Sequence, residues 1–318
     1  MPHKTKIQWC SHSSNPLRAE HNGKRGWSCE KISSGCAACY SEAMNKRLGT
    51  GLAFVARDNA AVTNYLDEKE LAHMLKFRPK PPYSSGRERP SVFVCDMTDI
   101  FGEWVPDESL DRMFTTFALR TDVDWLVLTK RAKRMWKYLS VRNAPLPNVW
   151  LGVSVENQRW ADERVPVLLD TPAAIRWVSY EPALGPVDFC KLSVPQGDPI
   201  DSTYWVANWD ALTGFRGHKA GGSTGAKLDW IVVGGESDQP GQKARTCSVD
   251  WIRATVEQCG DVGTACFVKQ LGSNVTSWPR CPVDCECGLH YGFKDRKAGD
   301  PSEWPAAIRV REFPKVPA

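Results

Sequence analysis

The 318-residue sequence has no long hydrophobic run, no repeat of fixed period and no low-complexity tract. No apolar stretch approaches the roughly 20 residues that a membrane-spanning helix requires. The first residues, MPHKTKIQW, also lack the apolar stretch of a secretory signal peptide. These absences exclude solenoid, propeller, collagen-like and coiled-coil architectures, and they lead us to expect a globular, cytoplasmic protein with no membrane partner.

A large excess of charge of either sign is missing as well. The 41 Lys and Arg residues outnumber the 37 Asp and Glu residues only slightly, for a formal net charge of +4, and this bias does not by itself identify a polyanionic partner. Cysteine, in contrast, is abundant, with 12 in the chain. Because structural disulfides are rare in a reducing compartment, metal or cluster ligation is the main alternative to simple burial of these thiols.

Short, nearly continuous apolar segments recur along the chain and predict buried strands. The predicted strands are Val92–Cys95, Trp125–Leu128, Val149–Val153, Ile175–Val178, Trp230–Val233 and Cys266–Val268, with a further one at Ile7–Trp9. Helical patterns fill the gaps between them. This alternation implies right-handed crossovers and a parallel sheet, and we expect an α/β fold with a partial or complete parallel (β/α) barrel of the TIM-barrel type.

Two of the intervening helices have clear sequence signals. The first follows Pro106, a residue favoured at helix starts. Its apolar face consists of Leu110, Met113, Phe114 and Phe117. The second starts at Ser248, a typical N-cap, and is predicted to end at Gly260. Its apolar residues are Ile252, Val256 and Cys259.

Two stretches interrupt the alternation and define the predicted domains. Residues 190–227 are rich in Gly and turn formers and separate two predicted strands by far more than an ordinary connection, so we expect an inserted loop or lid. From residue 274 the chain becomes rich in Cys, Pro and Gly. We therefore predict a (β/α) barrel over residues 1–273, with a cysteine loop at 29–39, and a small Cys-rich appendage over residues 274–318.

Polar and ionisable residues follow the predicted strands directly. They are Asp96 and Asp99, Lys130 and Arg131, Ser154 and Glu156, Glu181, Gly234, Gly235 and Glu236, and Lys269 and Gln270. In parallel βα architectures the carboxyl ends of the strands form the ligand-binding face. Each group taken singly also fits a helix cap or a turn, but their recurrence at the same point of every unit favours a shared site.

The sharpest local motif is Cys29-x6-Cys36-x2-Cys39, which is followed by a short helical stretch that Gly49 ends. Three thiolates on one loop fit three corners of an iron–sulfur cluster whose remaining iron is open to a small molecule. They also fit a zinc site that takes a fourth ligand from elsewhere. The available fourth ligands are His12, His21 and Cys10. Burial without metal is the third alternative.

A second cysteine group lies near the end of the chain. It comprises Cys281, Cys285, Cys287 and His290. Four nitrogen and sulfur ligands within ten residues suit a closed structural zinc site or an auxiliary cluster. We predict that this group binds metal and that zinc is the favoured ion.

Seven segments together resemble a known family. In order they are GCAACYSEAMNKR, SVFVCDMTDIF, LVLTKRAKRM, NVWLGVSVEN, RWVSYEPALGPV, DWIVVGGES and CFVKQLG. Over roughly Ile7 to Gly272 the sequence resembles the phage-encoded three-cysteine-motif family of uncharacterised proteins. The cysteine loop and the barrel are in turn similar to the radical S-adenosylmethionine superfamily, whose partial (β/α)6 barrels bind a [4Fe–4S] cluster through three closely spaced Cys. In that superfamily the first gap is usually three residues rather than six, and its Gly-Gly-Glu motif follows an earlier strand than Gly234 to Glu236 do.

This resemblance implies an enzyme in which Cys29, Cys36 and Cys39 hold a [4Fe–4S] cluster that binds S-adenosylmethionine at its open iron. Reduction through an electron donor would yield a 5′-deoxyadenosyl radical that abstracts hydrogen from the substrate, which we expect to be a nucleic acid or a nucleotide. The implied catalytic residues are Glu181 and Lys269. The implied substrate-binding residues are Lys130, Arg131 and Gln270. The implied cofactor-binding residues are Asp96, Asp99, Ser154, Glu156, Gly234, Gly235 and Glu236.

Two other functions stay open. One is a zinc-stabilised nucleic-acid-binding protein without catalysis, in which both cysteine groups are structural. The other is a non-radical hydrolase on the same barrel. The radical enzyme requires iron and sulfide, the binding protein requires zinc only, and the hydrolase is active with neither. The carboxylates at the strand ends disfavour the binding protein, because they repel phosphates.

Overall fold

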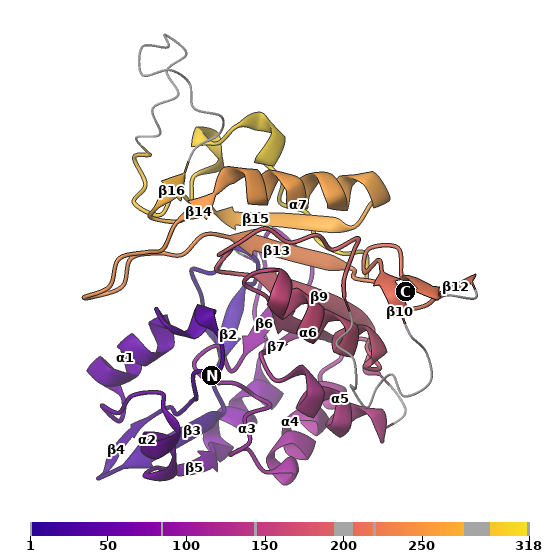
Figure 1. Ribbon diagram of the computed structural model, residues 1–318. Helices are drawn as coiled ribbons and strands as arrows, with labels where there is room; N and C mark the ends of the chain where they lie inside the picture. The colour runs from indigo at the N-terminus through magenta and orange to yellow at the C-terminus, as the bar shows by residue number, and fades with distance from the viewer. Residues whose placement is uncertain are drawn as a thin grey trace. The chain divides into compact units, whose positions relative to one another are not determined.

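The computed structural model covers residues 2–83, 85–142, 145–193, 206–218, 221–276 and 293–316. Eight strands make up the main sheet, in the order β1-β2-β6-β7-β8-β9-β13-β15 (Figure 1). Their bounds are His3–Lys4, His12–Ser14, Ser91–Val94, Asp124–Thr129, Val149–Ser154, Ile175–Tyr180, Trp230–Gly234 and Ala265–Gln270. The sheet is mostly parallel, since β6 runs parallel to β2 and β7, and β13 runs parallel to β9 and β15, whereas β1 is antiparallel to β2.

Helices and small sheets surround these strands. The helices are α1 Tyr40–Leu48, α2 Ala56–Ala60, α3 Glu68–Lys76, α4 Asp107–Leu119, α5 Ala132–Ser140, α6 Gln158–Asp170 and α7 Val249–Val262. Short 3-10 turns cover Ser34–Cys36, Pro301–Glu303 and Ala306–Ile308. The remaining strands are β3 Leu17–His21, β4 Lys24–Gly26, β5 Thr63–Leu66, β10 Val206–Trp209, β11 Phe215–His218, β12 Gly221–Thr224, β14 Cys247–Ser248 and β16 Val275–Thr276. In the described ranges of the chain, no helix is long and apolar enough to span a membrane.

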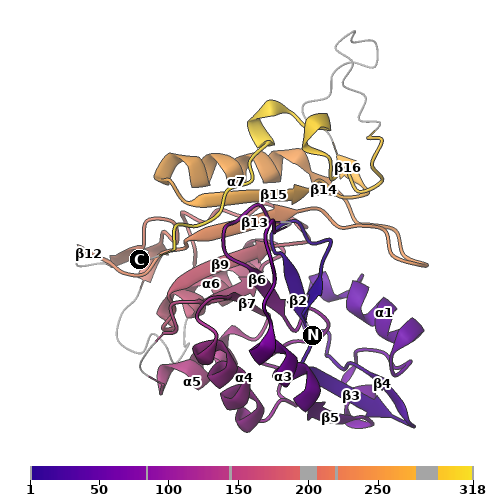
Figure 2. The same cartoon turned by 180° about the vertical axis from the view of Figure 1, so that it is seen from behind.

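The chain divides into two compact units. Unit 1 comprises residues 1–153 and 171–176, and unit 2 comprises residues 154–170 and 177–316. In unit 1, α3 packs on α4, and β3 pairs with both β4 and β5 to form a small antiparallel sheet. In unit 2, α7 packs along β13 and β15, as views from both sides show (Figure 1 and Figure 2).

All six strands predicted from continuous apolar segments are confirmed, as β6, β7, β8, β9, β13 and β15. Every residue of β6, β8 and β13 is buried. Strands of a parallel sheet are buried on both faces by the helices that cross over them, and this explains why their sequences show no alternation of apolar and polar residues. The mixed α/β class is therefore confirmed.

The strand predicted at Ile7–Trp9 is wrong. The strand beside β6 is β2, which begins at His12. Polar residues are tolerated there because hydroxyls satisfy the neighbouring backbone: Ser11 Oγ donates to Ser91 O over 2.7 Å, and Ser91 N donates to Ser11 Oγ over 2.9 Å. A strand with the sequence HSS contains no apolar residue that would predict it. The prediction therefore fell on the apolar residues Ile7 and Trp9, which precede it.

The order of the main sheet is open, with β1 and β15 at its two ends. In the part of the chain that the structure describes, β1 and β15 are not paired with each other. The prediction of a complete barrel therefore goes further than the observed strand order, and what is established is a mostly parallel sheet of eight strands.

The 190–227 segment contains more regular structure than the predicted loop. In its described part, β10, β11 and β12 form an antiparallel sheet, and a bridge joins Leu192 to Trp209. Gly214 precedes β11 with a φ of +77°, and a Cβ at this position would lie 2.5 Å from Gly225 O. The glycines of this segment thus belong to hairpins, which turn-rich composition also produces.

The predicted appendage is described only in part. Residues 277–292 lie outside the described residues, and the proposed metal ligands Cys281, Cys285, Cys287 and His290 are among them. That site and the boundary at residue 274 stay predictions. The later residues pair with β15: Val268 N donates to Val310 O, and Glu312 N donates to Cys266 O, each over 2.8 Å.

Both helices with clear sequence signals are confirmed. α4 follows Pro106, and the buried part of its face includes Leu110, Met113 and Phe117. α7 begins after Ser248, whose side chain accepts a hydrogen bond from Asp250 N. It ends at Gly263 rather than at the predicted Gly260. Gly263 has a φ of 73°, the left-handed conformation that ends helices, whereas a glycine within the helix only weakens it.

A buried amide secures the end of α4. Asn148 Nδ2 donates to Phe117 O, Arg120 O and Val123 O over 2.9 to 3.0 Å. The last carbonyls of a helix have no partner within the helix. Asn148 supplies one, and it thereby connects the end of α4 to the start of β8.

Replacing Asn148 with Ala should lower the free energy of unfolding by about 1–3 kcal/mol, because three buried carbonyl oxygens each lose one hydrogen-bond donor. Urea unfolding followed by circular dichroism measures the change. The control is Thr115→Ala, at an exposed position of α4. It should shift the free energy of unfolding by less than about 0.5 kcal/mol. Equally small effects for the two variants would contradict the capping role.

Candidate functional site

Three cysteines of the 29–39 loop share one environment in unit 1. Cys29 follows β4, Cys36 ends a 3-10 turn, and Cys39 precedes α1. All three are free, partly buried thiols. Burial, the Asp99 carboxylate and the other two thiols raise the pKa of Cys29 to about 12, while Arg131 acts in the opposite direction. The thiols are therefore close enough to influence one another electrostatically.

Cys39 lies at a helix start, where backbone N–H groups have no partner within the helix. Burial raises the pKa of its thiol, and the backbone N–H groups of Ser41 and Glu42 and the Lys130 ammonium lower it. Helix starts and cations favour the thiolate form. Since a metal ligand must be a thiolate, these groups assist the form of Cys39 that ligation needs.

The buried side chain of Asn45 holds the cysteine loop against α1. Its Oδ1 accepts hydrogen bonds from Trp27 N (2.9 Å) and Thr50 N (3.2 Å), and its Nδ2 donates to Leu52 O (3.1 Å). Gly26 provides the space, because a Cβ there would collide with Asn45 Oδ1. The chain that leads into the loop is thereby tied to the helix that follows the loop.

The turn after β6 docks on the start of α1. Asp96 O accepts hydrogen bonds from Tyr40 OH (2.5 Å) and Ser41 Oγ (3.0 Å). The preceding residue, Cys95, has a φ of 60°, which a residue other than glycine rarely adopts. Strain of this kind persists where the surrounding contacts hold the backbone. These contacts place Cys39 beside the carboxyl end of β6.

The carboxylate of Asp99 is fully engaged within unit 1. Its Oδ1 accepts from Thr129 Oγ1 (2.6 Å) and Phe101 N (3.0 Å). Its Oδ2 accepts from Lys130 N (3.0 Å) and Arg131 Nη1 (3.1 Å). Asp99 thus joins the turn after β6 to the turn after β7, a task that the strand-end pattern did not distinguish from cofactor binding.

Arg131 is the central cation of this region. Besides its bond to Asp99, its Nη2 lies 3.7 Å from Glu30 Oε2, and its guanidinium stacks 4.7 Å above the centre of the Trp104 ring. Only 8% of its side chain is exposed. The structure therefore brings three predicted groups together: the thiols, Asp99 and Arg131.

Glu181 and Lys269, the two residues predicted to be catalytic, form an ion pair in unit 2. Lys269 Nζ lies 2.9 Å from Glu181 Oε1, and Ser179 Oγ donates to Glu181 Oε2 over 3.4 Å. Glu181 follows β9 and Lys269 lies near the end of β15, on either side of β13. Their side chains remain 12% and 24% exposed, so both are within reach of a ligand.

Backbone packing requires the two adjacent glycines at the end of β13. A Cβ on Gly235 would lie 1.9 Å from Leu271 O, and one on Gly234 would lie 3.1 Å from Gln270 O and 2.9 Å from the Glu181 side chain. Gln270 Nε2 donates to Gly235 O over 3.0 Å. Close packing within unit 2 accounts for both glycines without a bound cofactor.

Two further predicted cofactor ligands, Glu236 and Glu156, are paired with arginines. Glu236 accepts from Arg245 Nη2 (2.5 Å) and Nε (3.0 Å). Arg164 Nη1 donates to Glu156 Oε2 (3.2 Å) and to Ser154 O (2.8 Å). Both carboxylates are buried, and a buried charge needs such a partner. These residues have a role inside unit 2 that does not depend on a ligand.

No three His, Cys, Asp or Glu side chains converge on a single metal-ion position among the residues that the structure describes. The histidines considered as zinc ligands contact other groups: the His12 ring lies 4.8 Å from that of Phe77, and His21 Nδ1 lies 3.0 Å from Ala61 O. Cys10 is fully buried. These contacts do not favour His12 or His21 as the fourth ligand of a zinc site at the cysteine loop.

The family model described as "Protein of unknown function (DUF5131)" matches residues 4–299. The chain belongs to this family. The matched range includes the cysteine loop, the Asp99 network and the Glu181–Lys269 pair of this DUF5131 member. No curated protein and no solved structure matches the chain.

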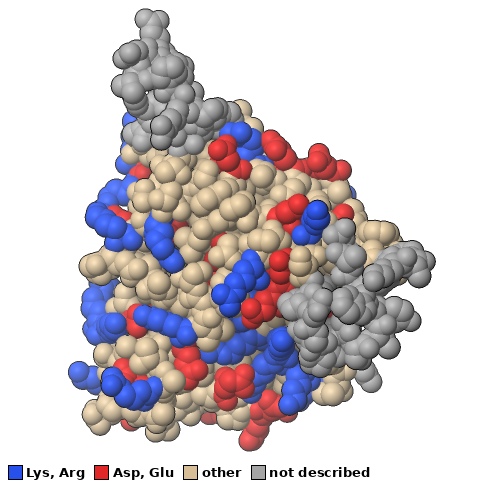
Figure 3. All heavy atoms as spheres, in the orientation of Figure 1, with Lys and Arg blue, Asp and Glu red and all other residues tan. Residues whose placement is uncertain are grey.

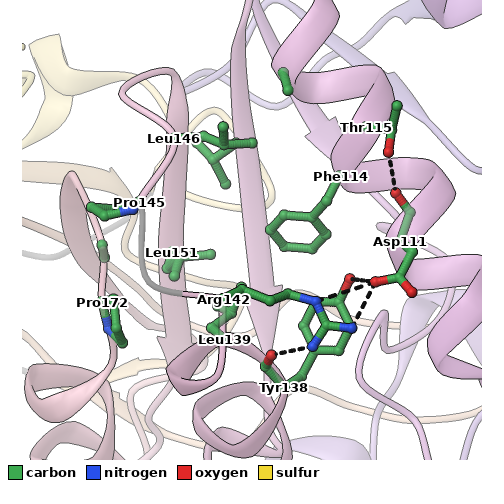
Figure 4. A pocket seen from close by; sticks show the side chains of 13 residues that line it. Asp111, Phe114, Thr115, Tyr138, Leu139, Arg142, Pro145, Leu146, Leu151 and Pro172 are labelled. Atoms are coloured by element: carbon green, nitrogen blue, oxygen red, sulfur yellow. Dashed lines mark hydrogen bonds and ion pairs between the residues drawn. The ribbon is translucent and has the colours of Figure 1, made fainter.

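Sequence reasoning missed a pocket of about 420 Å³ between α4, α5 and the start of β8 in this DUF5131 member (Figure 4). Phe114, expected in the core, lines it and is partly exposed. The polar groups of the pocket satisfy one another: Asp111 Oδ1 accepts from Tyr138 OH and from Arg142 Nη2, each over 2.7 Å. None of the residues predicted to act on a ligand lines this pocket.

Other contacts that build the site had only weak signals in the sequence. Tyr40 and Asn45 belong to the segment that follows Cys39, but nothing in the pattern shows that they bond to chain segments far from that helix. Arg245 lies in a loop with no regular pattern. Its pairing with Glu236 follows from tertiary structure alone.

Gly235→Ala should destabilise this DUF5131 member by about 1–3 kcal/mol or more, because the added methyl group meets a backbone carbonyl rather than a flexible side chain. Gly260→Ala is the control. This glycine lies within α7 with no atom within 4 Å of a Cβ, so the substitution should stabilise the protein by about 0.5–1 kcal/mol. Thermal and urea unfolding measure both changes. Wild-type stability of Gly235→Ala would show that packing does not require the glycine.

Asp96→Asn should stabilise the protein at neutral pH. Burial raises the pKa of Asp96, with Asn15 and Arg18 acting in the opposite direction. The folded state therefore holds the proton more tightly than the unfolded chain does. The resulting stabilisation is complete below the ordinary Asp pKa of about 4 and is lost as the pH rises through the folded-state pKa. Asparagine stays neutral, so its advantage over wild type should grow between about pH 4 and pH 7.

Asp238→Asn is the control of opposite sign. Its pKa is lowered, first by the hydrogen bond from Ala244 N (2.8 Å) and then by Lys243. This variant should lose stability relative to wild type as the pH rises from acid to neutral. Urea unfolding at several pH values measures both differences. A pH-independent difference for Asp96→Asn would contradict the burial of that carboxyl group.

Proposed function

We propose that this protein is an iron–sulfur enzyme of the radical S-adenosylmethionine type, in which Cys29, Cys36 and Cys39 hold a [4Fe–4S] cluster. The observation that carries the proposal is the shared electrostatic environment of three free thiols on a loop docked at the end of a parallel strand. In such a cluster each thiolate binds a different iron atom. In the structure the three thiols are near one another but do not converge on one metal position. This fits a cluster with one iron atom for each thiolate better than it fits a single zinc ion.

The chain's own residues support such a centre electrostatically. Burial raises the pKa of both Cys29 and Cys39, and Arg131 and Lys130, respectively, act against that rise. The two cations also offset part of the negative charge that three thiolates bring. Asp99 orients Arg131 through a 3.1 Å bond. When bound, a cluster of this type supplies one electron to S-adenosylmethionine.

The Glu181–Lys269 pair is the part of unit 2 that best fits a ligand. S-adenosylmethionine carries both an ammonium group and a carboxylate on its amino-acid portion. An ion pair of 2.9 Å that is partly exposed can open to receive both, Glu181 binding the ammonium group and Lys269 the carboxylate. Glu156 and Glu236 are buried against arginines, and we assign them to the scaffold of unit 2.

The proposal extends to substrate and setting. A nucleic acid or nucleotide fits the start of α5, where Lys130 and Lys133 add positive charge, since helix starts and cations bind phosphate. All nine cysteines in the described residues are free, which agrees with a reducing, cytoplasmic setting. Kinship with phage-encoded three-cysteine proteins and a partial barrel of the radical-enzyme kind are parts of the same proposal.

Anaerobic reconstitution with iron and sulfide should give a brown protein. The triple variant Cys29→Ala, Cys36→Ala, Cys39→Ala should lose about four iron atoms per chain relative to wild type, because each of the three thiolates is a cluster ligand. Iron and sulfide analysis measures the loss, and formation of 5′-deoxyadenosine from S-adenosylmethionine under dithionite should disappear with it.

Cys190→Ala is the matched control, since Cys190 is also a partly exposed free thiol and should leave the iron content unchanged. The difference between variants is informative even if the C-terminal cysteines take up metal. A triple variant that keeps its iron, or a wild-type protein that binds only zinc at these thiols, would overturn the proposal.

A further inference from the structure

The polarity of α1 is inverted for a surface helix. Its buried residues are Ser41, Glu42 and Asn45. Its exposed apolar residues, spaced four apart, are Tyr40, Met44 and Leu48, with exposed fractions of 43%, 37% and 65%. A helix on the surface of a globular protein normally buries its apolar stripe. An apolar stripe that faces outward marks a surface that another molecule covers.

Two more exposed apolar side chains lie in the segments just before and just after α1. Ile32 and Val55 are each 38% exposed. A backbone hydrogen bond from Lys31 N to Phe54 O (3.2 Å) joins the residues that precede them. Five of the eight large hydrophobic side chains exposed in the described ranges thus fall between residues 32 and 55. We name the exposed stripe of Tyr40, Met44 and Leu48 the α1 surface.

Cations surround the α1 surface. Residues 18–58 contain seven Lys and Arg but four Asp and Glu, and two of these acids, Glu42 and Asp58, expose only 9% and 17% of their side chains. Arg25 in β4 is 78% exposed and lies 3.5 Å from Glu20 Oε2, and Arg47 on α1 is exposed as well. Figure 3 shows Lys and Arg side chains gathered at the left of the view, over the α1, α2 and β4 elements seen there in Figure 1.

We propose that the α1 surface docks an acidic protein that delivers single electrons to the cluster, an inference that rests on the function proposed above. An apolar centre within a charged rim is typical of a protein interface, in which Met and Arg are enriched. Aliphatic side chains such as Met44 and Leu48 offer little to a phosphate backbone, so this composition favours a protein over a nucleic acid. The basic rim selects a partner with an acidic surface.

The position of α1 connects this surface to the proposed redox chemistry. The helix begins directly after Cys39, so a protein seated on α1 lies next to a proposed cluster ligand. In the transfer step the carrier is oxidised by one electron and the cluster is reduced by one electron. No covalent bond forms or breaks and no proton moves.

The test measures reduction of the reconstituted full-length protein by reduced flavodoxin, an acidic one-electron carrier, in a stopped-flow instrument. Met44→Gln with Leu48→Gln removes the apolar stripe and keeps good helix formers, and Arg25→Glu with Arg47→Glu reverses the rim charge. Each pair should slow reduction by flavodoxin about tenfold or more, and leave reduction by dithionite at the wild-type rate. High salt should slow the wild-type reaction with flavodoxin.

Matched controls lie on other helices of unit 1. Leu119→Gln, at a position 67% exposed at the end of α4, and Lys137→Glu, on the exposed side of α5, should leave both rates unchanged. Wild-type rates with flavodoxin in both pairs of α1 variants would overturn the inference. So would a wild-type protein that dithionite reduces but flavodoxin does not.

Two other occupants are tested in the same variants. Loss of binding to a fluorescent single-stranded oligonucleotide, with flavodoxin reduction intact, would assign the surface to nucleic acid. Loss of a dimer in sedimentation, again with reduction intact, would assign it to a second copy of the chain. Iron content separates this inference from the proposed function. A wild-type protein that binds no iron would contradict the proposed function. An iron-loaded protein whose α1 variants are reduced by flavodoxin at the wild-type rate would contradict only the docking inference.

Discussion

The carboxylate of Asp99 is the contact on which the arrangement around the cysteine loop depends most. It is buried, and a buried carboxylate is tolerated only when donors replace the water it has lost. Those donors come from the turns after two neighbouring parallel strands, β6 and β7, and from Arg131. Because the same guanidinium also faces Glu30 and influences Cys29, one carboxylate fixes both the backbone at the strand ends and the charge beside the thiols.

The polar residues at the strand ends fall into two physical classes. Asp99, Glu156 and Glu236 are buried with cationic or backbone donors and stabilise the turns in which they lie. Among the residues that the structure describes, the side chains of Glu181 and Lys269 pair with each other and with the Ser179 hydroxyl, and they retain contact with solvent. Their proximity in sequence to a strand end does not separate one class from the other.

This division also explains how far the sequence alone could lead. Strands such as β8 and β13 were predictable because burial on both faces leaves an uninterrupted apolar run. The strand β2 was not, because its polar sequence depends on distant partners: Ser14 Oγ donates to Glu70 on α3, and the preceding Ser11 bonds to Ser91 in β6. The glycines at 234 and 235 were recognised as special, yet the cause lies in Leu271 O, which no local pattern reveals. The thiol loop was evident from its spacing. The inverted polarity of α1 was not evident. Periodicity shows which residues share the apolar face of a helix, but it does not show whether that face is turned toward the core or toward solvent.

The contacts that enclose the thiol loop are long-range, and this has a consequence for biosynthesis. Ser28 is bonded to Thr98, 70 residues further along the chain, and Tyr40 to Asp96, 56 residues further. At translation rates of about 5–20 residues per second, the 70 residues that bring Thr98 take roughly 4–14 s to synthesise. During that interval the three thiols have left the ribosome's active centre without the partners that later cover them. The loop that carries the thiols can therefore reach its folded arrangement only after β6 and the turn that follows it have been synthesised.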